Sequence, residues 1–102
     1  MTYAVIFRST RAIDDGIEYD HWSAITDRDV RLAEGYISHY GFREPDTRRG
    51  VTITFFDSLD SIKKWRQQSD HLIAQDLGRE KFYQDYEVQV TEVLREYKWE
   101  KP

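Results

Sequence analysis

The stretch that decides the fold runs from Tyr36 to Phe56 and reads YISHYGFREPDTRRGVTITFF. Its first part, Tyr36–Arg43, is rich in aromatic residues and alternates its side chains in the manner of a strand. Residues 44–50 are polar and include a proline and a glycine, a composition that favours a hairpin loop over a domain linker. Val51–Phe56 alternates threonine with apolar residues and predicts a second strand. The stretch therefore predicts two neighbouring strands joined by a short loop.

On the N-terminal side of this hairpin the sequence predicts a strand and a helix. Tyr3–Thr10 is compact and rich in aromatic and β-branched residues, as strands are. The cluster Asp14-Asp15-Gly16 predicts a turn. An approximate 3.6-residue apolar period then runs from Tyr19 to Ala33, interrupted by the charged run at residues 27–29, and predicts a helix with a narrow buried stripe that Gly35 ends.

On the C-terminal side, Ser58 is a suitable N-cap for a helix whose periodic residues continue to Arg66. We expect a bend near Ser69-Asp70 and a further helical segment, His71–Leu77, that Gly78 stops. The last strand is predicted over Tyr86–Tyr97. The order strand, helix, strand, strand, helix, strand predicts an α+β fold of the ferredoxin-like βαββαβ type, with a four-stranded antiparallel sheet covered by helices on one face.

The predicted strands carry apolar side chains on both faces, although a half-solvated antiparallel sheet would alternate cleanly. Strict alternation in the second strand places Tyr36, Ser38, Tyr40 and Phe42 on one face and Ile37, His39 and Arg43 on the other. An uncovered apolar sheet face of this size indicates an interface. We predict a two-fold homodimer in which the sheets pack face to face and the long last strand reaches toward the partner.

Composition narrows the classes of function. The chain has 102 residues, which is the length of one domain, and its net charge of −4 argues against a nucleic-acid partner. The absence of cysteine excludes disulfides, thiolate metal sites and a cysteine nucleophile. The longest apolar stretch, Tyr3–Phe7, is far shorter than the roughly 18 residues of a membrane helix, so we expect no membrane contact and a cytoplasmic location. The scattered His21, His39 and His71 predict no metal site.

One segment carries a family resemblance. Between Trp65 and Tyr86 the sequence contains Trp65, His71, Gln75, Gly78-Arg79-Glu80 and Phe82-Tyr83, and it is preceded by Phe55-Phe56-Asp57-Ser58-Leu59 and Gly35-Tyr36. With these residues the chain resembles, over nearly its whole length, the antibiotic biosynthesis monooxygenase family of dimeric α+β barrels. It departs from the family pattern at Phe82, where relatives often carry tryptophan, so the aromatic ring is kept and an N–H donor is lost.

The resemblance implies a homodimer with a pocket between sheet and helices in each subunit. It also implies oxidation of a small aromatic or polyketide-like substrate by O₂ without metal, flavin or haem, so no cofactor is expected. Such chemistry needs a base near neutral pKa, an aromatic enclosure and hydrogen-bond donors. His71 is the candidate base, because histidine titrates in that range, with Trp65 as a second catalytic residue. The candidate substrate-binding residues are Phe7, His39, Phe55, Phe82 and Tyr83.

Other interpretations stay open for these residues and for the function. Trp65 continues an apolar helix stripe and is equally suited to a core, and His71 at a helix start is suited to capping or packing. Haem-degrading relatives use a helical histidine about ten residues after a tryptophan, but that position is Gln75 here, which disfavours haem chemistry. A non-catalytic module that binds a small ligand or responds to stress is the alternative, because fold does not fix function.

Overall fold

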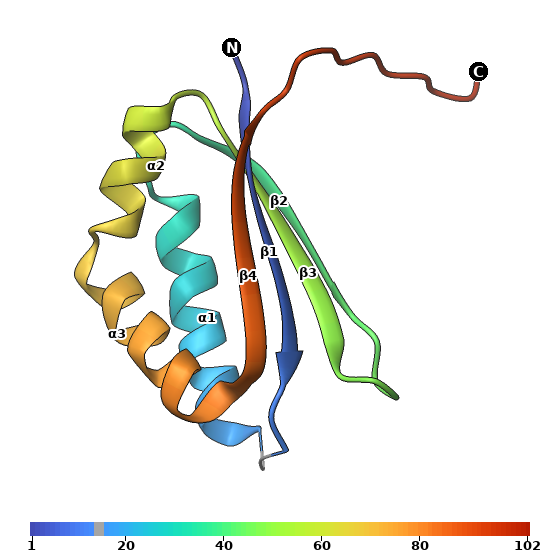
Figure 1. The fold of residues 1–102 in the computed structure, drawn as a ribbon. Helices are drawn as coiled ribbons and strands as arrows, with labels where there is room; N and C mark the ends of the chain where they lie inside the picture. The colour runs from blue at the N-terminus through green and yellow to red at the C-terminus, as the bar shows by residue number, and fades with distance from the viewer. Residues whose placement is uncertain (14–15) are drawn as a thin grey trace.

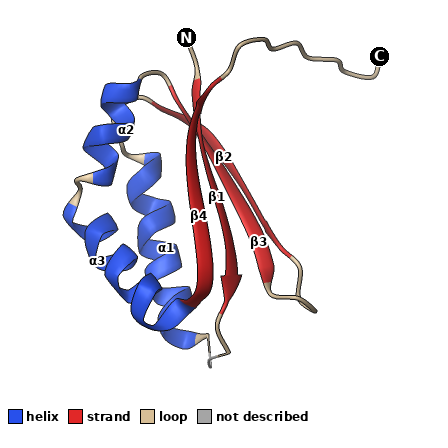
Figure 2. Cartoon of the chain, in the orientation of Figure 1, coloured by secondary structure: helices blue, strands red, loops and turns tan. Residues whose placement is uncertain are grey.

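The helices of the protein lie on one face of a twisted four-stranded sheet in the computed structural model, which describes residues 1–13 and 16–102, without the side chains of residues 69–71 (Figures 1 and 2). The elements in chain order are β1 (Tyr3–Arg11), α1 (Ile17–Arg31), β2 (Tyr36–Arg43), β3 (Arg49–Phe56), α2 (Leu59–Arg66), α3 (Ser69–Leu77), the π-helical turn η1 (Gly78–Phe82) and β4 (Tyr83–Glu92). The strand order is β2-β3-β1-β4 and every neighbouring pair is antiparallel. The predicted ferredoxin-like α+β fold is confirmed.

Two local devices fix the entry into α2. The Ser58 hydroxyl accepts a hydrogen bond from the Ser61 backbone N–H at 3.0 Å, so the predicted N-cap is confirmed. Gly35, which follows α1, has a φ of 78°, and a Cβ on it would collide with the side chains of Asp57 and Ser61. Its carbonyl accepts from the Asp57 backbone N–H at 2.9 Å. The loop after α1 is therefore seated directly against the start of α2.

The hydrophobic core lies at the α2 end of the layer between helices and sheet. Its buried members are Val30, Phe56, Ile62 and Trp65, and Phe56 is completely inaccessible. Trp65 and Ile62 come from the same face of α2, as the apolar stripe predicts. Partly buried residues of the strands, including Tyr3 and Tyr36, pack around this cluster.

A bulge in β2 changes the predicted faces of that strand. Tyr36 pairs with Phe56, but Ser38 pairs with Phe55, so Ile37 is an extra residue in the ladder. The bulge places Tyr36 and His39 on the same, helix-facing side and Tyr40 on the other. The prediction that grouped Tyr36 with Ser38, Tyr40 and Phe42 was therefore wrong, because strict alternation does not hold across a bulge.

The last strand differs from its predicted range at both ends. Gly78 does not end the helical segment, because the π-helical turn η1 begins at this residue. β4 then begins at Tyr83 rather than Tyr86. It ends at Glu92 rather than Tyr97, because Glu92 pairs with Tyr3, where β1 begins, and the last hydrogen bond runs from the Val93 N–H to the carbonyl of Thr2. Residues 93–102 then run away from the sheet (Figure 1). The predicted turn residues Asp14 and Asp15 lie outside the described residues.

The helices leave the other face of the sheet uncovered (Figure 2). Ladder pairing places apolar side chains from three strands on this face, which is called the open face below. Its apolar members are Ala4, Ile6, Tyr40, Phe42, Val51, Ile53 and Phe55. Phe42 is 74% exposed and Tyr40 61% exposed. The expectation of apolar side chains on both faces of the sheet is confirmed.

Candidate functional site

The helix-facing side of β2 and β3 becomes small and polar toward the hairpin loop. Ladder pairing sets His39 beside Thr54, Gly41 beside Thr52, and Arg43 beside Gly50. These positions are half-buried or exposed, whereas Phe56 at the other end of β3 is sealed. Helix α1 therefore covers this part of the sheet without closing it off. We call the region around His39, Gly41, Thr52, Thr54 and Phe7, which pairs with Thr52, the inner layer.

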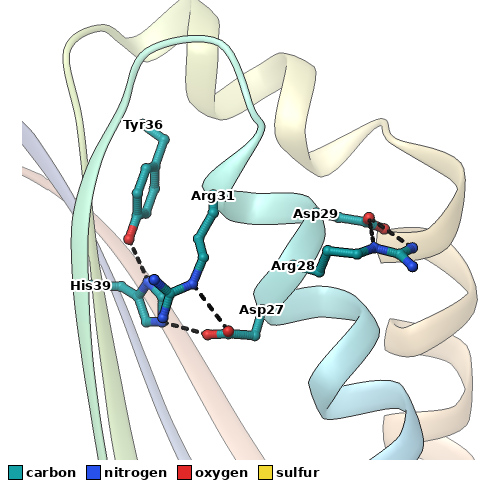
Figure 3. A network of polar contacts seen from close by, with 6 residues as sticks. All are labelled: Asp27, Arg28, Asp29, Arg31, Tyr36 and His39. Atoms are coloured by element: carbon teal, nitrogen blue, oxygen red, sulfur yellow. Dashed lines mark hydrogen bonds and ion pairs between the residues drawn. The ribbon is translucent and has the colours of Figure 1, made fainter.

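A hydrogen-bonded chain of side chains joins α1 to β2 at the edge of the inner layer (Figure 3). Tyr36 Oη lies 2.7 Å from His39 Nδ1, and His39 Nε2 lies 2.6 Å from Asp27 Oδ1. Arg31 Nε donates to the other oxygen of Asp27 at 3.1 Å. The His39 side chain is 16% exposed and that of Asp27 46% exposed, so the chain of contacts opens to solvent on the α1 side. Three of its members, Asp27, His39 and Tyr36, are called the triad below.

The charge state of Asp27 determines how protons are arranged in the triad. Burial alone would raise the pKa of this carboxyl, but hydrogen bonds from Arg31 and His39 and the positive charge of Arg31 hold it below its ordinary value. A charged carboxylate only accepts, so the Nε2–H of His39 donates to it. In a neutral imidazole, Nδ1 is then the acceptor, and the Tyr36 hydroxyl donates to it. The arrangement is carboxylate, imidazole, hydroxyl.

An aromatic cluster lies where β1 and β4 meet η1. The Phe7 ring is 5.3 Å from Tyr83 and 5.5 Å from Tyr86, measured between ring centroids. Tyr19 of α1 packs edge-on against Tyr83 at 6.1 Å and against Phe82 at 5.5 Å. Edge-to-face contacts at these distances each add roughly 0.5–1.5 kcal/mol beyond the area that the rings bury. The cluster forms an aromatic wall beside the inner layer.

Charged groups surround the hydroxyl end of this wall. Burial raises the pKa of the Tyr83 hydroxyl, and the neighbouring Tyr19 adds to the rise, while Arg43 and Arg11 act against it. The Arg11 guanidinium stacks over the Tyr19 ring with its Cζ 3.6 Å from the ring centroid. Tyr83 therefore stays protonated at neutral pH, with its hydroxyl in a hydrogen bond with the Tyr19 side chain.

A tight arrangement closes the hairpin end of the sheet. Arg43 donates to Ser9 Oγ at 2.9 Å and to the Arg48 carbonyl at 2.6 Å. Its guanidinium crosses over Gly50, where a Cβ would come within 2.7 Å of Cζ. Glycine at position 50 thus makes room for Arg43 to reach β1. The hydrogen bonds tie the hairpin loop to the centre of the sheet.

A separate cleft of about 570 Å³ lies on the β4 side of the helical layer. It is open to solvent. Apolar side chains from α2, α3 and β4 line it, together with polar side chains from the α2–α3 segment. The lining residues are Leu59, Ile62, Lys63, Arg66, Gln67, Leu72, Gln75 and Val90. Gln75, the position at which haem-degrading relatives carry histidine, is among them.

The structure brings together some of the predicted site residues and separates others. Phe7, His39 and Tyr83 share the helix-facing side of the sheet, and Phe82 is buried behind Tyr19. Phe55 lies on the open face.

The two predicted catalytic residues lie in the α2–α3 segment. Trp65 is part of the core cluster with Phe56. His71 stands in the first turn of α3, directly before the cleft residue Leu72, and its side chain lies outside the described residues. Their catalytic roles stay predictions.

Asp27 and Tyr36 were not predicted from the sequence to be functional residues. Asp27 was noted only as part of the charged run that interrupts the apolar stripe of α1. That interruption was the available signal, because a carboxylate at a position that turns toward the sheet needs a polar partner there. Nothing local in the sequence announces the bulge that turns His39 toward it.

The described residues hold no group of three or more histidine, aspartate or glutamate side chains placed to bind a metal ion. No helix in the described part of the chain is long and apolar enough to cross a membrane.

Known proteins similar to this chain bear on its family and its fold. No profile of a known protein family matches the sequence. The uncharacterised protein YqjZ of Bacillus subtilis (strain 168) is 35% identical over 97 residues, which cover 92% of this chain and 81% of that protein. The chain belongs to the YqjZ family.

Solved structures extend the comparison of this YqjZ-family chain at the level of the fold. Rv0793 from Mycobacterium tuberculosis superposes with a TM-score of 0.82 at 18% identity, covering 96% of this chain and all of that one (100%). SnoaB from Streptomyces nogalater, a cofactor-independent oxygenase, gives 0.77 at 18% identity over 93% of this chain and 95% of its own. A protein described as an antibiotic biosynthesis monooxygenase gives 0.75 at 12% identity, covering 91% and 99%. The resemblance to the antibiotic biosynthesis monooxygenases is confirmed in the fold.

Proposed function

We propose that the protein is a cofactor-independent monooxygenase that oxidises a small, electron-rich aromatic or polyketide-like compound between its sheet and helices. The observation that carries the proposal is the inner layer, where Phe7, His39 and Tyr83 face the helices beside small, half-buried side chains. SnoaB, which shares the fold, is a cofactor-independent oxygenase, and this supports the same class of chemistry here.

The proposed reaction needs no external reductant. A phenol or enol with an acidic proton loses that proton, and the electron-rich anion reacts with O₂. One oxygen atom enters the substrate, converting a CH₂ group to C=O, and the other leaves as water with the two hydrogens of that group. The aromatic wall, which includes Tyr83, excludes water and orients the ring. His71 and Trp65 are the catalytic residues that the family resemblance suggests. Phe82 belongs to the predicted substrate-binding set, whereas Phe55, also predicted, lies on the open face, across the sheet from the inner layer.

Oxygen uptake tests the proposal. Chelator-treated protein is incubated with a panel of polycyclic phenols, and O₂ consumption and ¹⁸O incorporation from ¹⁸O₂ are measured against a protein-free control. We expect protein-dependent uptake with one labelled atom in the product. His71→Ala is compared with His21→Ala, the exposed histidine of α1, and a rate unchanged in His71→Ala removes His71 from the scheme. Uptake equal to the protein-free control across the panel contradicts the proposed function.

We propose that two copies of the chain associate through the open face. The exposed rings of Tyr40 and Phe42 and the half-buried Ile53 form an apolar surface from which the helices are absent. The exposed Leu94, Tyr97 and Trp99 of the C-terminal segment add apolar area for a partner. Sedimentation at micromolar concentration should give a dimer, and Phe42→Glu should shift it toward the monomer. A monomeric unmodified protein would refute the dimer.

A non-catalytic binding role is the second candidate, and the cleft beside β4 favours it. Its mixture of apolar and polar lining residues suits a small amphipathic molecule. Titration with haemin tests one ligand class directly, and because Gln75 occupies the position of the haem ligand, we expect no Soret shift. A shift that Leu72→Arg abolishes would instead assign haem binding to the cleft.

A further inference from the structure

We propose that Asp27, His39 and Tyr36 form a proton relay that removes the acidic proton of the substrate, with Tyr36 as the catalytic residue that contacts it. The inference rests on the proposed function and names the groups that begin the reaction. His39 is the base behind Tyr36, and Asp27 is a positioning residue. The predicted base, His71, is then not required for this step.

The geometry of the triad carries the inference. Both nitrogens of one imidazole are occupied at short range, by Tyr36 Oη at 2.7 Å and Asp27 Oδ1 at 2.6 Å. The contact with Asp27 is a hydrogen bond to a charged carboxylate, a class of bond that is shorter and stronger than a neutral one. A carboxylate on one nitrogen and a hydroxyl on the other is the order by which enzymes activate a hydroxyl group through a base. Asp27 comes from α1, and Tyr36 and His39 come from β2. The bulge at Ile37 turns both β2 side chains toward α1.

The groups around His39 hold its ring in place and pair it with a carboxylate. Asp27 is the acidic partner of His39, and its second oxygen is held by Arg31, so the carboxylate neither rotates away nor takes the proton. The groups that face His39 are Tyr36 on its own strand and Asp27 on α1, with the uncharged Thr54 beside it on β3. A carboxylate in contact with the ring stabilises its protonated form.

The proton movement balances without an additional reactant. The substrate O–H bond breaks and its proton goes to Tyr36 Oη, while the Tyr36 proton goes to His39 Nδ1. The products of the step are a substrate phenolate or enolate, an intact Tyr36 hydroxyl and a His39 imidazolium that Asp27 stabilises. After the oxygen chemistry, the same path in reverse returns the proton to the oxygen atom that leaves as water.

The triad residues are partly exposed, as residues that contact a ligand need to be. Asp27 is half exposed and Tyr36 half-buried, so the hydroxyl lies at the boundary between the core and the inner layer. The neighbouring positions on the helix-facing side are Thr54 and Gly41, which present little bulk. The relay requires a substrate ring that spans the inner layer from the aromatic wall and brings its hydroxyl into contact with Tyr36 Oη.

A chromophoric phenol tests the relay independently of turnover. 4-Nitrophenol is colourless as the phenol and yellow as the phenolate, so its absorbance reports its ionisation when bound. With the unmodified protein we expect binding to shift its ionisation to lower pH. Tyr36→Phe keeps the ring in the core and removes the hydroxyl, and His39→Gln removes the base, so both should return the ionisation of the bound probe to that of free nitrophenol. His21→Gln, on the exposed face of α1, is the matched control and should behave as the unmodified protein.

Turnover provides the second readout and separates the two proposals. Removing a general base commonly costs about 10²–10⁴-fold in rate, so Tyr36→Phe should lower kcat by that order with a smaller change in KM. Asp27→Glu should rescue more of the rate than Asp27→Asn, which no longer fixes the tautomer. Full activity in a folded Tyr36→Phe variant, or no phenolate signal with the unmodified protein, overturns the relay. A phenolate signal without oxygen uptake upholds the relay and refutes the monooxygenase.

Discussion

The two ends of the layer between helices and sheet are built from different residues. At the α2 end, Phe56, Trp65 and Ile62 are sealed from water and form the core. At the hairpin end, Gly41 and Thr52 leave the helix-facing side of the sheet small and accessible. Burial of large apolar side chains contributes about 1.5–3 kcal/mol each, whereas small half-buried ones contribute little. The core at the α2 end therefore contributes more to stability than the β2–β3 part of the hairpin end, where the buried large side chain is Phe82 beside β4.

The triad lies between these two regions. Tyr36 packs its ring against Phe56, with centroids 6.5 Å apart, and directs its hydroxyl to His39. The rigid end thus holds one partner of the network, while His39 and Asp27 stand beside the accessible end. Substitutions at the two ends should therefore change the free energy of unfolding by different amounts.

Truncation of the core should have the largest effect. Phe56→Ala removes the only completely buried large side chain in the described part of the chain and leaves a cavity, so we expect a loss of about 3–5 kcal/mol in the free energy of unfolding. Urea denaturation monitored by tryptophan fluorescence measures it. Leu32→Ala, at an 80% exposed position, is the control and should stay within about 0.5 kcal/mol. If Thr52→Ala lowered the free energy of unfolding by as much as Phe56→Ala, the two ends would not differ in their contribution to stability.

Gly35→Ala should come next. The new Cβ meets Asp57 and Ser61 in a backbone conformation with positive φ, so strain and overpacking together should cost roughly 2–4 kcal/mol. Gly16 is the matched control, because its φ of 80° is close to the 78° of Gly35 and, among the described residues, the nearest side-chain atom to its Cβ is 3.9 Å away. Gly16→Ala should lose only the strain, about 1–2 kcal/mol. Equal losses in thermal unfolding would show that crowding at α2 contributes nothing.

Gly50→Ala tests the hairpin end. Its Cβ displaces the Arg43 guanidinium and weakens the hydrogen bonds to Ser9 and Arg48, so we expect a loss of about 1–2 kcal/mol. Gly41→Ala meets only the Thr52 hydroxyl, at 3.2 Å, and should cost less. Chemical denaturation of the two variants side by side gives the difference, and a larger loss for Gly41→Ala would contradict the role assigned to Arg43.

Asp27→Asn should have the smallest effect, and that effect should depend on pH. The folded-state pKa of Asp27 lies below its ordinary value of 3.8, so its charged form adds stability above that pH and the contribution disappears as pH falls through the folded pKa. The stability gap between the unmodified protein and Asp27→Asn should therefore close as the pH falls below the ordinary value of 3.8. His39→Gln removes one of the two donors and should reduce the pH dependence without abolishing it. If the stability gap widened in acid instead, the pKa of Asp27 would be raised in the folded protein rather than lowered.

The features of the fold that depend on neighbouring residues were predictable from the sequence. Ser58 caps α2 through Ser61, three residues away, and the stripe that contains Ile62 and Trp65 identifies the core side of that helix. The order of elements follows from the same local periodicities. The end of β4 was not predictable in this way, because it is set by Thr2 at the other end of the chain.

The candidate site was predictable in residue type but not in its connections. Phe7, His39 and Tyr83 were identified from the family resemblance, and the structure places all three on the helix-facing side. The contact of His39 with Asp27 spans twelve positions and depends on the register of β2 against β3. Register is a property of two strands together, so a residue-by-residue interpretation of β2 does not give it.

The extra residue Ile37 has a consequence for recognising this network in related sequences. Because the bulge absorbs one position, tyrosine and histidine face the same side with two residues between them, as Tyr-x-x-His. A relative whose strand is regular keeps both side chains under α1 only with one residue between them, as Tyr-x-His. An alignment that forces the two patterns into the same columns would misplace the histidine, so a one-residue gap at Ile37 is the signature by which shared ancestry of the triad should be sought.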